Sequence, residues 1–244
     1  MLVKGKKKKN YLLECVKRIV RNAPRGKALD LGCGSGDYAY MLQEFGFDTV
    51  AADTYTDHFR YADAVPFMQF DACKSLPFAP ETFDYVLFME VVEHLYRPFD
   101  VIADIHRIVR KGGTLLLSTP NILNIRSRLR YLFEGAYDYF REPLIEQTRN
   151  EKEKNAANLH VIPWRYHELE YLLYKNGFAI EGIYTSRCEH YALSFLIPFI
   201  LFQLKSKSLR SEKSGTISYR RIHDIIGKKE MLFGRHLVVQ AKKE

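Results

Sequence analysis

The chain has 244 residues, a length that suits one domain with insertions, and its hydrophobic content of 47% excludes wholesale disorder. A formal net charge of +8 invites nucleic acid or an anionic membrane surface as a partner, but the chain carries no RNA-binding signature and no zinc module, so nucleic acid is disfavoured. No signal peptide is visible and the scattered cysteines lack metal or disulfide spacing, so we expect reduced thiols in the cytoplasm; they are Cys15, Cys33, Cys73 and Cys188.

The first 26 residues predict a basic tail followed by a helix. Most of the tail's charge lies in the lysine-rich run at residues 4–9, and a second basic stretch occupies residues 205–210. A terminal lysine run is most often a solvated tail. We therefore assign residues 1–26 to a tail and helix that precede the domain.

A glycine-rich turn follows the first predicted strand. Residues 28–31 are apolar and predict a buried strand, and Gly32, Gly34 and Gly36 lead into a helix over 38–45. Glycines let the backbone approach a ligand closely, and a helix start offers free N–H groups. A dinucleotide-binding turn, whose fingerprint is Gly-x-Gly-x-x-Gly, also fits. If its first glycine is Gly34, its last glycine position falls on the small residue Ala39.

Predicted strands and helices then alternate along the chain. Strands over 48–52, 66–70 and 83–90 lead into or end at the acidic residues Asp53, Asp71 and Glu90. The elements that follow are a helix over 101–110 closed by Lys111-Gly112-Gly113, a strand over 114–118, a helix over 165–176 and strands over 178–185 and 236–241. This alternation predicts a doubly wound, mostly parallel α/β sheet with ligands at the carboxyl ends of its strands.

The ordered motifs resemble those of the class I S-adenosylmethionine-dependent methyltransferases. The resemblance starts from Asp-x-Gly-x-Gly-x-Gly at residues 30–36 and covers most of residues 27–186. It implies a Rossmann-like, seven-stranded sheet in a single domain over 27–244. It also implies S-adenosyl-L-methionine as the cofactor. This chain departs from the family's minimal fold by helical inserts that we expect after the fifth strand and between the sixth and seventh.

The same resemblance assigns cofactor contacts at the strand ends. The three glycines would line the methionine part with Asp30 near its amino group, Asp53 would accept from the ribose hydroxyls, and Asp71 and Ala72 would meet the adenine. Each aspartate can instead serve as a turn or helix-cap residue. The implied cofactor-binding residues are Asp30, Gly32, Cys33, Gly34, Gly36, Asp53, Thr54, Asp71, Ala72 and Glu90.

Glu90, Glu93 and His94 follow the fourth strand and share one face of a helical turn. Two carboxylates and an imidazole can hold a divalent cation or act as base and orienting group. The set resembles the Glu-x-x-Glu-His segment of ubiquinone-biosynthesis O-methyltransferases and the metal site of small-RNA terminal 2′-O-methyltransferases, where a later histidine completes the coordination.

Three alternatives stay open for this cluster. Glu90, Glu93, His94 and His160 would bind Mg²⁺ or Mn²⁺, or His94 with Glu93 would act as a metal-free catalytic base, or the segment only touches the cofactor and begins a helix. The remaining histidines are given no role; they are His58, His106, His167, His190, His223 and His236.

Two inserts exceed the minimal fold. Residues 121–161 combine arginines with aromatic side chains, and we expect them to fold over the site as a cap. Residues 187–230 contain an apolar run at 191–204 that is too short to span a bilayer and is followed by basic residues. Contact with a membrane surface through 191–213, packing on the sheet, a homodimer interface and a substrate lid all fit this pattern.

The leading hypothesis is O-methylation of a small molecule, a glycan or a lipid-linked intermediate, because a base or a metal beside the cofactor serves a hydroxyl nucleophile. The alternatives are RNA 2′-O-methylation and a non-catalytic, methyltransferase-like binding or regulatory protein. We expect the protein in the cytoplasm, either free or peripheral to the inner face of the membrane.

Overall fold

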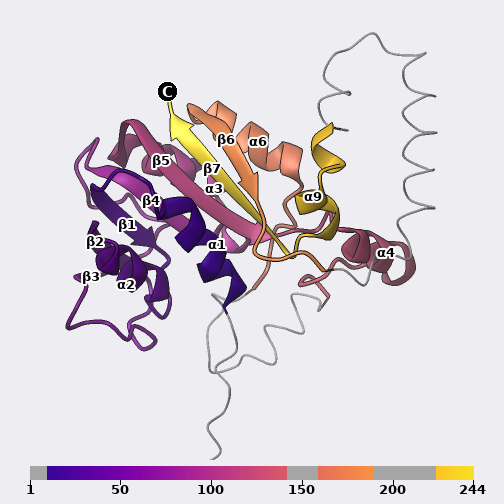
Figure 1. Ribbon diagram of the computed structural model, residues 1–244, viewed down its shortest axis with the longest axis horizontal. Coiled ribbons are helices and arrows are strands. Elements are labelled where there is room, and N and C mark those ends of the chain that lie inside the picture. The colour runs from indigo at the N-terminus through magenta and orange to yellow at the C-terminus, as the bar shows by residue number, and fades with distance from the viewer. Residues whose placement is uncertain (1–9, 142–158, 190–223) are drawn as a thin grey trace, which may run out of the picture.

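The computed structural model describes residues 10–141, 159–189 and 224–244, and its centre is a seven-stranded sheet in the order β3-β2-β1-β4-β5-β7-β6 (Figure 1). Strands β1 to β5 run parallel, and β7 runs antiparallel to both β5 and β6. The strands are β1 (Lys27–Leu31), β2 (Asp48–Asp53), β3 (Phe67–Gln69), β4 (Phe83–Met89), β5 (Val109–Pro120), β6 (Phe178–Tyr184) and β7 (His236–Lys243). The predicted doubly wound, mostly parallel seven-stranded sheet is confirmed.

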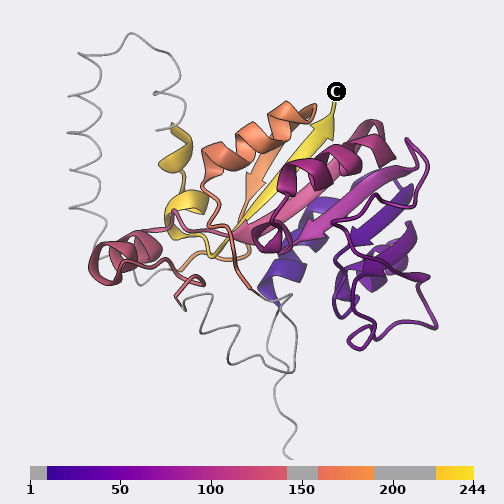
Figure 2. The same ribbon diagram turned by 180° about the vertical axis from the view of Figure 1, so that it is seen from behind.

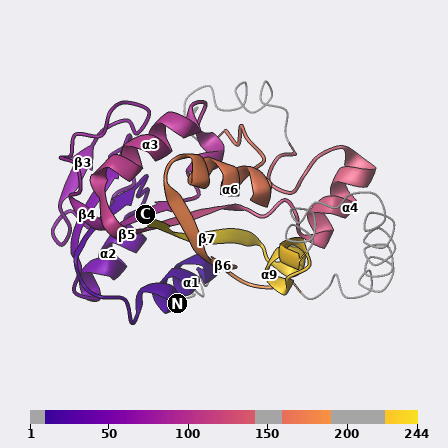
Figure 3. The ribbon, with the colours of Figure 1, turned by 90° about the horizontal axis from the view of Figure 1, so that it is seen from above.

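Helices cover both faces of this sheet, with α1 and α2 on one face and α3 and α6 on the other (Figure 3). Successive residues of β5 supply both cores: Leu115 and Leu117 pack with α3 and α6, whereas Leu116 packs with α1 and α2. This alternation follows from the two-residue period of a strand, and burial on both faces explains the nearly continuous apolar runs. The helices are α1 (Tyr11–Val20), α2 (Asp37–Glu44), the short 3₁₀ helix η1 (Val92–His94), α3 (Pro98–Ile108), α4 (Ile125–Glu134), α6 (Tyr166–Lys175) and α9 (Lys229–Phe233).

The predicted end of the third long helix was wrong. Helix α3 begins at Pro98 and ends at Ile108, and Lys111-Gly112-Gly113 lies inside β5 instead of closing the helix. Val109 pairs with Phe83, and the pairing with β4 resumes only at Thr114, so the extra residues form an irregularity in the strand. Gly112 has a φ of +72° there, a conformation that suits glycine at an irregular strand position as well as at a helix end.

Only the flanks of the two inserts belong to the described residues. Helix α4 packs against α9 through Ile125, Leu129 and Leu232, on the side of the sheet away from β1 to β3 (Figures 1 and 2). The predicted cap over the site therefore stays a prediction for residues 142–158. The lysine run at 4–9 and the expected membrane contact at 191–213 also lie outside the described residues. Within the described part of the chain, no helix is long and apolar enough to cross a membrane.

Contacts between residues 187–189 and 233–235 extend the hairpin of β6 and β7 into the first residues of the second insert. Cys188 forms a bridge with Gly234, the Glu189 N–H donates to the Phe233 carbonyl at 2.8 Å, and the Arg235 N–H donates to the Arg187 carbonyl at 3.1 Å. These contacts fix the two ends of the insert at the sheet.

Asn121 ties the end of β5 to α9. Its side chain is 2% exposed, and its Nδ2 donates to the carbonyl oxygens of Glu230, Met231 and Gly234 at 3.3, 3.0 and 2.9 Å. Its Oδ1 accepts from the Leu123 N–H at 3.0 Å, so both ends of the amide are bonded. Asn121 therefore has a structural role in this fold.

Replacing Asn121 should destabilise the fold strongly. Asn121→Ala leaves buried carbonyls without their donor and should lower the free energy of unfolding by about 2–3 kcal/mol. Asn121→Asp should cost more, because a carboxylate would face the same three carbonyl oxygens. Urea denaturation measures both, with Thr56→Ala, which removes one exposed hydroxyl bond, as the control. A loss in Asn121→Ala no greater than in the control would contradict this structural role.

Candidate active site

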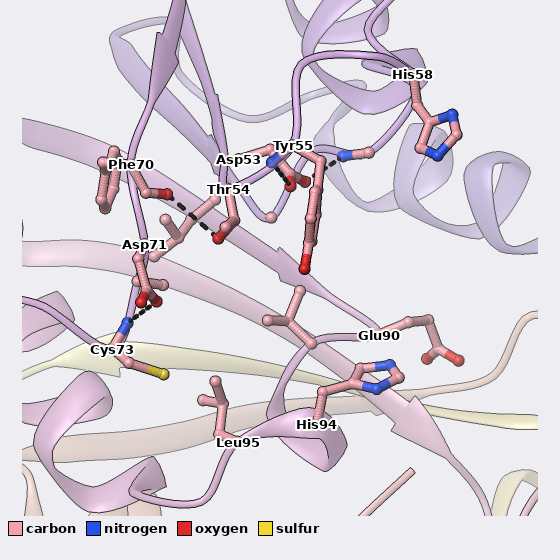
Figure 4. A pocket seen from close by; sticks show the side chains of 15 residues that line it. Asp53, Thr54, Tyr55, His58, Phe70, Asp71, Cys73, Glu90, His94 and Leu95 are labelled. Atoms are coloured by element: carbon pink, nitrogen blue, oxygen red, sulfur yellow. Dashed lines mark hydrogen bonds between the residues drawn. The ribbon is translucent and has the colours of Figure 1, made fainter. Parts of the chain in front are cut away.

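A cavity of about 430 Å³ opens at the carboxyl ends of β1, β2 and β4 (Figure 4). The chain runs outward from β1 to β2 and β3 and then returns to β4 on the other side of β1, and ligands of open α/β sheets bind at such a switch point. The cavity is lined by Leu31, Gly32, Gly34, Asp53, Thr54, Tyr55, His58, Phe70, Asp71, Ala72, Cys73, Glu90, Val91, His94 and Leu95. Seven of the ten predicted cofactor residues are among these, and the other three, Asp30, Cys33 and Gly36, do not line the cavity.

The glycine turn leaves open space beside its backbone at Gly34 but not at Gly32. Gly32 and Gly34 have φ values of +75° and +50°, which side chains rarely adopt. A Cβ at Gly32 would lie 2.5 Å from a methyl carbon of Val91, whereas a Cβ at Gly34 would meet no atom within 4 Å. Because Gly34 lines the cavity, a side chain there would take up space that a ligand can use. The turn therefore fits a ligand that contacts the main chain.

Asp30 connects the strand before the glycine turn to the helix after it. It is buried, and its Oδ2 accepts from the Ala39 N–H of α2 at 3.0 Å. Burial raises the pKa of Asp30 to about 7, partly offset by this hydrogen bond. Cys33 is also buried, and burial raises the pKa of its thiol. Gly36 is the N-cap residue of α2.

Asp53 and Asp71 face the cavity and also hold their own turns. The Asp53 carboxylate accepts from the N–H groups of Gly34 at 2.8 Å and Tyr55 at 3.0 Å, so it connects β2 to the glycine turn. Asp71 accepts from the Cys73 N–H at 2.9 Å. A carboxylate has about four acceptor positions, so these bonds leave capacity for a ligand. The turn role and the binding role are thus compatible.

Glu90 lies across the cavity from Asp53, next to His94 (Figure 4). Its φ is +56°, an unusual value for glutamate, and its N–H donates to the carbonyl and the hydroxyl of Ser118 at 3.1 and 3.0 Å. The Ser118 hydroxyl donates to Glu90 Oε1 at 2.7 Å. The side chain is 30% exposed, and partial burial raises its pKa to about 7.

Glu93 points the other way, into the protein. Its side chain is 0% exposed, and neither carboxylate oxygen has a hydrogen-bond partner among the described residues. The Thr119 hydroxyl lies beside it without completing a bond of normal geometry. Burial, and then the charge of Glu90, raise the pKa of Glu93 well above its usual range. A buried carboxyl without donors is unfavourable unless a proton or a cation neutralises it.

His94 and His160 meet beside this carboxyl group. Nδ1 of His94 lies 2.9 Å from the Leu159 carbonyl oxygen, and Nδ1 of His160 lies 2.7 Å from the Tyr139 carbonyl oxygen. Because a carbonyl only accepts, we assign the hydrogen of each neutral ring to Nδ1, which leaves the Nε2 lone pairs available. Burial lowers the pKa of His94, which favours its neutral form.

Glu93, His94 and His160 can share one metal ion. One ligand atom from each lies within 4.8 Å of the others. Two imidazoles and a carboxylate form a donor set typical of divalent transition metals, and the unbonded Glu93 oxygens fit a cation. The sequence predicted four ligands, but Glu90 is not part of this group, because Ser118 holds its carboxylate toward the cavity instead.

Sequence reasoning missed Tyr139 and His236. Tyr139 has a φ of +70°, its carbonyl orients His160, and its hydroxyl accepts from Arg235. His236, predicted to have no role, lies with Nε2 3.7 Å from Glu90 Oε2. Neither belongs to a local pattern, because long-range contacts bring them to the site. His58, also given no role, lines the cavity.

The raised pKa of Asp30 predicts that stability falls as pH rises. The folded state holds this proton up to about pH 7 while the unfolded chain releases it near pH 3.8, so unfolding becomes easier across that window. Asp30→Asn keeps an acceptor for Ala39 and removes the titration. The variant should therefore gain about 3 kcal/mol over the wild type between pH 5 and pH 8. Urea denaturation at both pH values tests this, and parallel pH profiles would contradict it.

Residues 29–117 match the family model described as a methyltransferase domain. The ubiquinone biosynthesis O-methyltransferase of Methylococcus capsulatus is 31% identical over 130 residues, covering 46% of this chain and 55% of the relative. The enzyme of the same name from Aliivibrio fischeri is 33% identical over 132 residues, covering 51% of this chain and 53% of the relative. The chain thus spans about half the length of these curated relatives.

A solved structure of a SAM-dependent methyltransferase from Archaeoglobus fulgidus has the same fold, with a TM-score of 0.56 and 21% identity over 95% of this chain and 94% of that one. The matched residues contain the glycine turn and the carboxylates Asp53, Asp71 and Glu90 that line the cavity. Residues 29–117 therefore form a methyltransferase domain, and these similarities support a class I S-adenosylmethionine-dependent methyltransferase.

Proposed function

We propose that this chain transfers the methyl group of S-adenosylmethionine to a hydroxyl group of a small molecule. The observation that carries the proposal is the cavity that joins the glycine turn, Asp53 and Asp71 to Glu90 and His94. The curated relatives are named O-methyltransferases of ubiquinone biosynthesis, which supports a hydroxyl acceptor.

The cavity residues suit the parts of this cofactor. The backbone of Gly32 and the open space beside Gly34 would receive the methionine half, and Asp53 would accept from the ribose hydroxyls. Asp71 and Ala72 would meet the adenine amino group and ring edge. When bound, S-adenosylmethionine supplies a methyl carbon already activated by the sulfonium, so the protein must chiefly align the acceptor oxygen with it.

The acceptor hydroxyl must lose its proton as the new carbon–oxygen bond forms and the carbon–sulfur bond breaks. In a metal-free site the Nε2 lone pair of His94, which lines the cavity, is the group placed to take that proton. Glu93, His94 and His160 would alternatively hold a divalent cation, which lowers the pKa of a hydroxyl beside it. The three ligand atoms and the unbonded Glu93 oxygens favour the cation.

RNA 2′-O-methylation is the second candidate, because the same three residues would serve a ribose hydroxyl equally well. The positive charge that would favour RNA binding lies in residues 4–9 and 205–210, which are outside the described residues. RNA binding that falls steeply with salt would favour it. A glycan or lipid-linked acceptor, membrane contact through 191–213 and a homodimer also stay predictions.

Asp53→Ala should weaken cofactor binding. The variant loses a charged acceptor for the ribose and the bond that holds Gly34, so we expect a 10- to 100-fold rise in the dissociation constant of S-adenosylhomocysteine. Calorimetric titration measures this, with the exposed Asp57→Ala on the same loop as the control. No binding to the wild type would overturn the methyltransferase proposal and leave a regulatory role.

His160→Ala should remove metal binding and leave the cofactor cavity intact, because His160 does not line it. Calorimetry with Mn²⁺ alone should show one site in the wild type and at least tenfold weaker binding in the variant. The control is His58→Ala, which removes a histidine from the cavity wall outside the cluster. Full turnover by metal-free wild type would refute the cation and leave His94 as the base.

A further inference from the structure

The Glu90 carboxylate is approached at both of its oxygen atoms. The Ser118 hydroxyl donates to Oε1 at 2.7 Å, and Nε2 of His236 lies 3.7 Å from Oε2. The three residues come from adjacent strands, since Glu90 follows β4, Ser118 lies in β5 and His236 begins β7. Sheet register therefore fixes their relation: Ser118 pairs with Met89 and Val238, and Pro120 pairs with His236.

The His236 ring also contacts Ser186 through its other nitrogen. Its Nδ1 lies 2.6 Å from the hydroxyl oxygen of Ser186, and its side chain is 17% exposed. Burial, together with the charge of Arg235, lowers the pKa of His236 to about 4, so the ring is neutral near pH 7. A neutral imidazole has one N–H, and a hydroxyl can either donate or accept. Facing a carboxylate, the favourable arrangement places the hydrogen on Nε2 and lets Nδ1 accept from Ser186.

We propose that His236 is a positioning residue that, oriented by Ser186, holds the Glu90 carboxylate toward the cationic methionine half of the bound cofactor. The cofactor part of this inference rests on the proposed function. With Ser118 alone, the Glu90 carboxylate could rotate about its hydrogen bond at Oε1. Ser118 and His236 together fix the orientation of the carboxylate. The 3.7 Å separation is longer than a hydrogen bond, and such contacts often shorten only when the ligand is bound.

Tyr139 and Arg235 complete the surroundings of His236. The Tyr139 ring centroid lies 6.2 Å from that of His236, and the Arg235 guanidinium lies over the Tyr139 ring. Arg235 also favours the ionised form of Glu90. Ser118 and Arg235 thus both oppose the rise that burial causes in the pKa of Glu90, and an ionised Glu90 is what a cationic ligand requires.

The first test measures binding of S-adenosylhomocysteine, which carries the methionine ammonium group. His236→Ala should weaken it on the order of tenfold, and His236→Gln, whose amide N–H can face the same oxygen, should recover most of the loss. Glu90→Gln should weaken it at least as much as His236→Ala. His106→Ala, which removes a histidine packed on Phe178, is the control and should bind like the wild type. Thermal unfolding of each variant separates lost binding from lost folding.

The second test reads the His236 ring without any ligand. Nitrogen-15 spectra that correlate ring nitrogens with ring protons distinguish the two neutral tautomers. His236 should carry its hydrogen on Nε2, whereas His94 and His160 should carry theirs on Nδ1. Ser186→Ala should abolish the single tautomer of His236 and leave the other two rings unchanged.

The outcomes separate the two proposals. Normal binding by His236→Ala alongside weakened binding by Glu90→Gln overturns the positioning role. A hydrogen on Nδ1 of His236 in the wild type also overturns it, because Nε2 would then present a lone pair to the carboxylate. A wild type that binds no S-adenosylhomocysteine overturns the proposed function and the cofactor half of this inference, while the tautomer still decides whether His236 orients Glu90.

Discussion

A left-handed backbone conformation at Glu90, held by two hydrogen bonds to Ser118, directs the chain as it leaves β4. Non-glycine residues rarely adopt it, so the surrounding bonds must offset its strain. The turn starts η1, which sends Glu93 inward and His94 toward the cavity. The Glu93 carbonyl then accepts from the N–H groups of Val161 and Ile162 at 2.8 and 3.0 Å, next to His160.

The site therefore contains buried carboxyl groups that the fold provides with few hydrogen bonds or none. Asp30 has one hydrogen bond to Ala39, and the Glu93 carboxylate has none among the described residues. Each lowers stability when ionised, since burial disfavours charge. A ligand cation beside either group would recover part of that loss, and binding would then stabilise the folded state by mass action. The same buried carboxyl groups therefore lower the stability of the free protein and favour the binding of a cation.

Sequence reasoning succeeded where the chemistry is local. Strands, the glycine turn and the acidic residues that follow strands are all short-range patterns, and the parallel sheet brings those strand ends to one edge. The i, i+1 pair Glu93 and His94 is equally local. Glu90 lies outside the cluster of Glu93, His94 and His160, because the spacing assumes an ideal helical turn and the left-handed residue breaks that turn. The end of helix α3 was predicted wrongly at residues 111–113, because glycines suit both a helix end and an irregular strand.

Contacts between distant parts of the chain explain what the sequence did not show. His236 reaches Glu90 only because β7 pairs antiparallel with β5, and Tyr139 reaches His160 from an insert without periodicity. A histidine at the start of a strand carries no sign of the carboxylate it will face. Such residues become visible only once strand order and register are known.

The closed β6–β7 hairpin makes the sheet independent of the length of the segment that follows Glu189. Because residues 187–189 already pair with 233–235, the sheet sets no length requirement on the residues between Glu189 and Asp224. Substitutions, insertions and deletions there leave the strand pairing that positions Glu90 and Ser118 untouched. We therefore expect homologues to differ in the length of this segment while keeping the lining of one cofactor cavity.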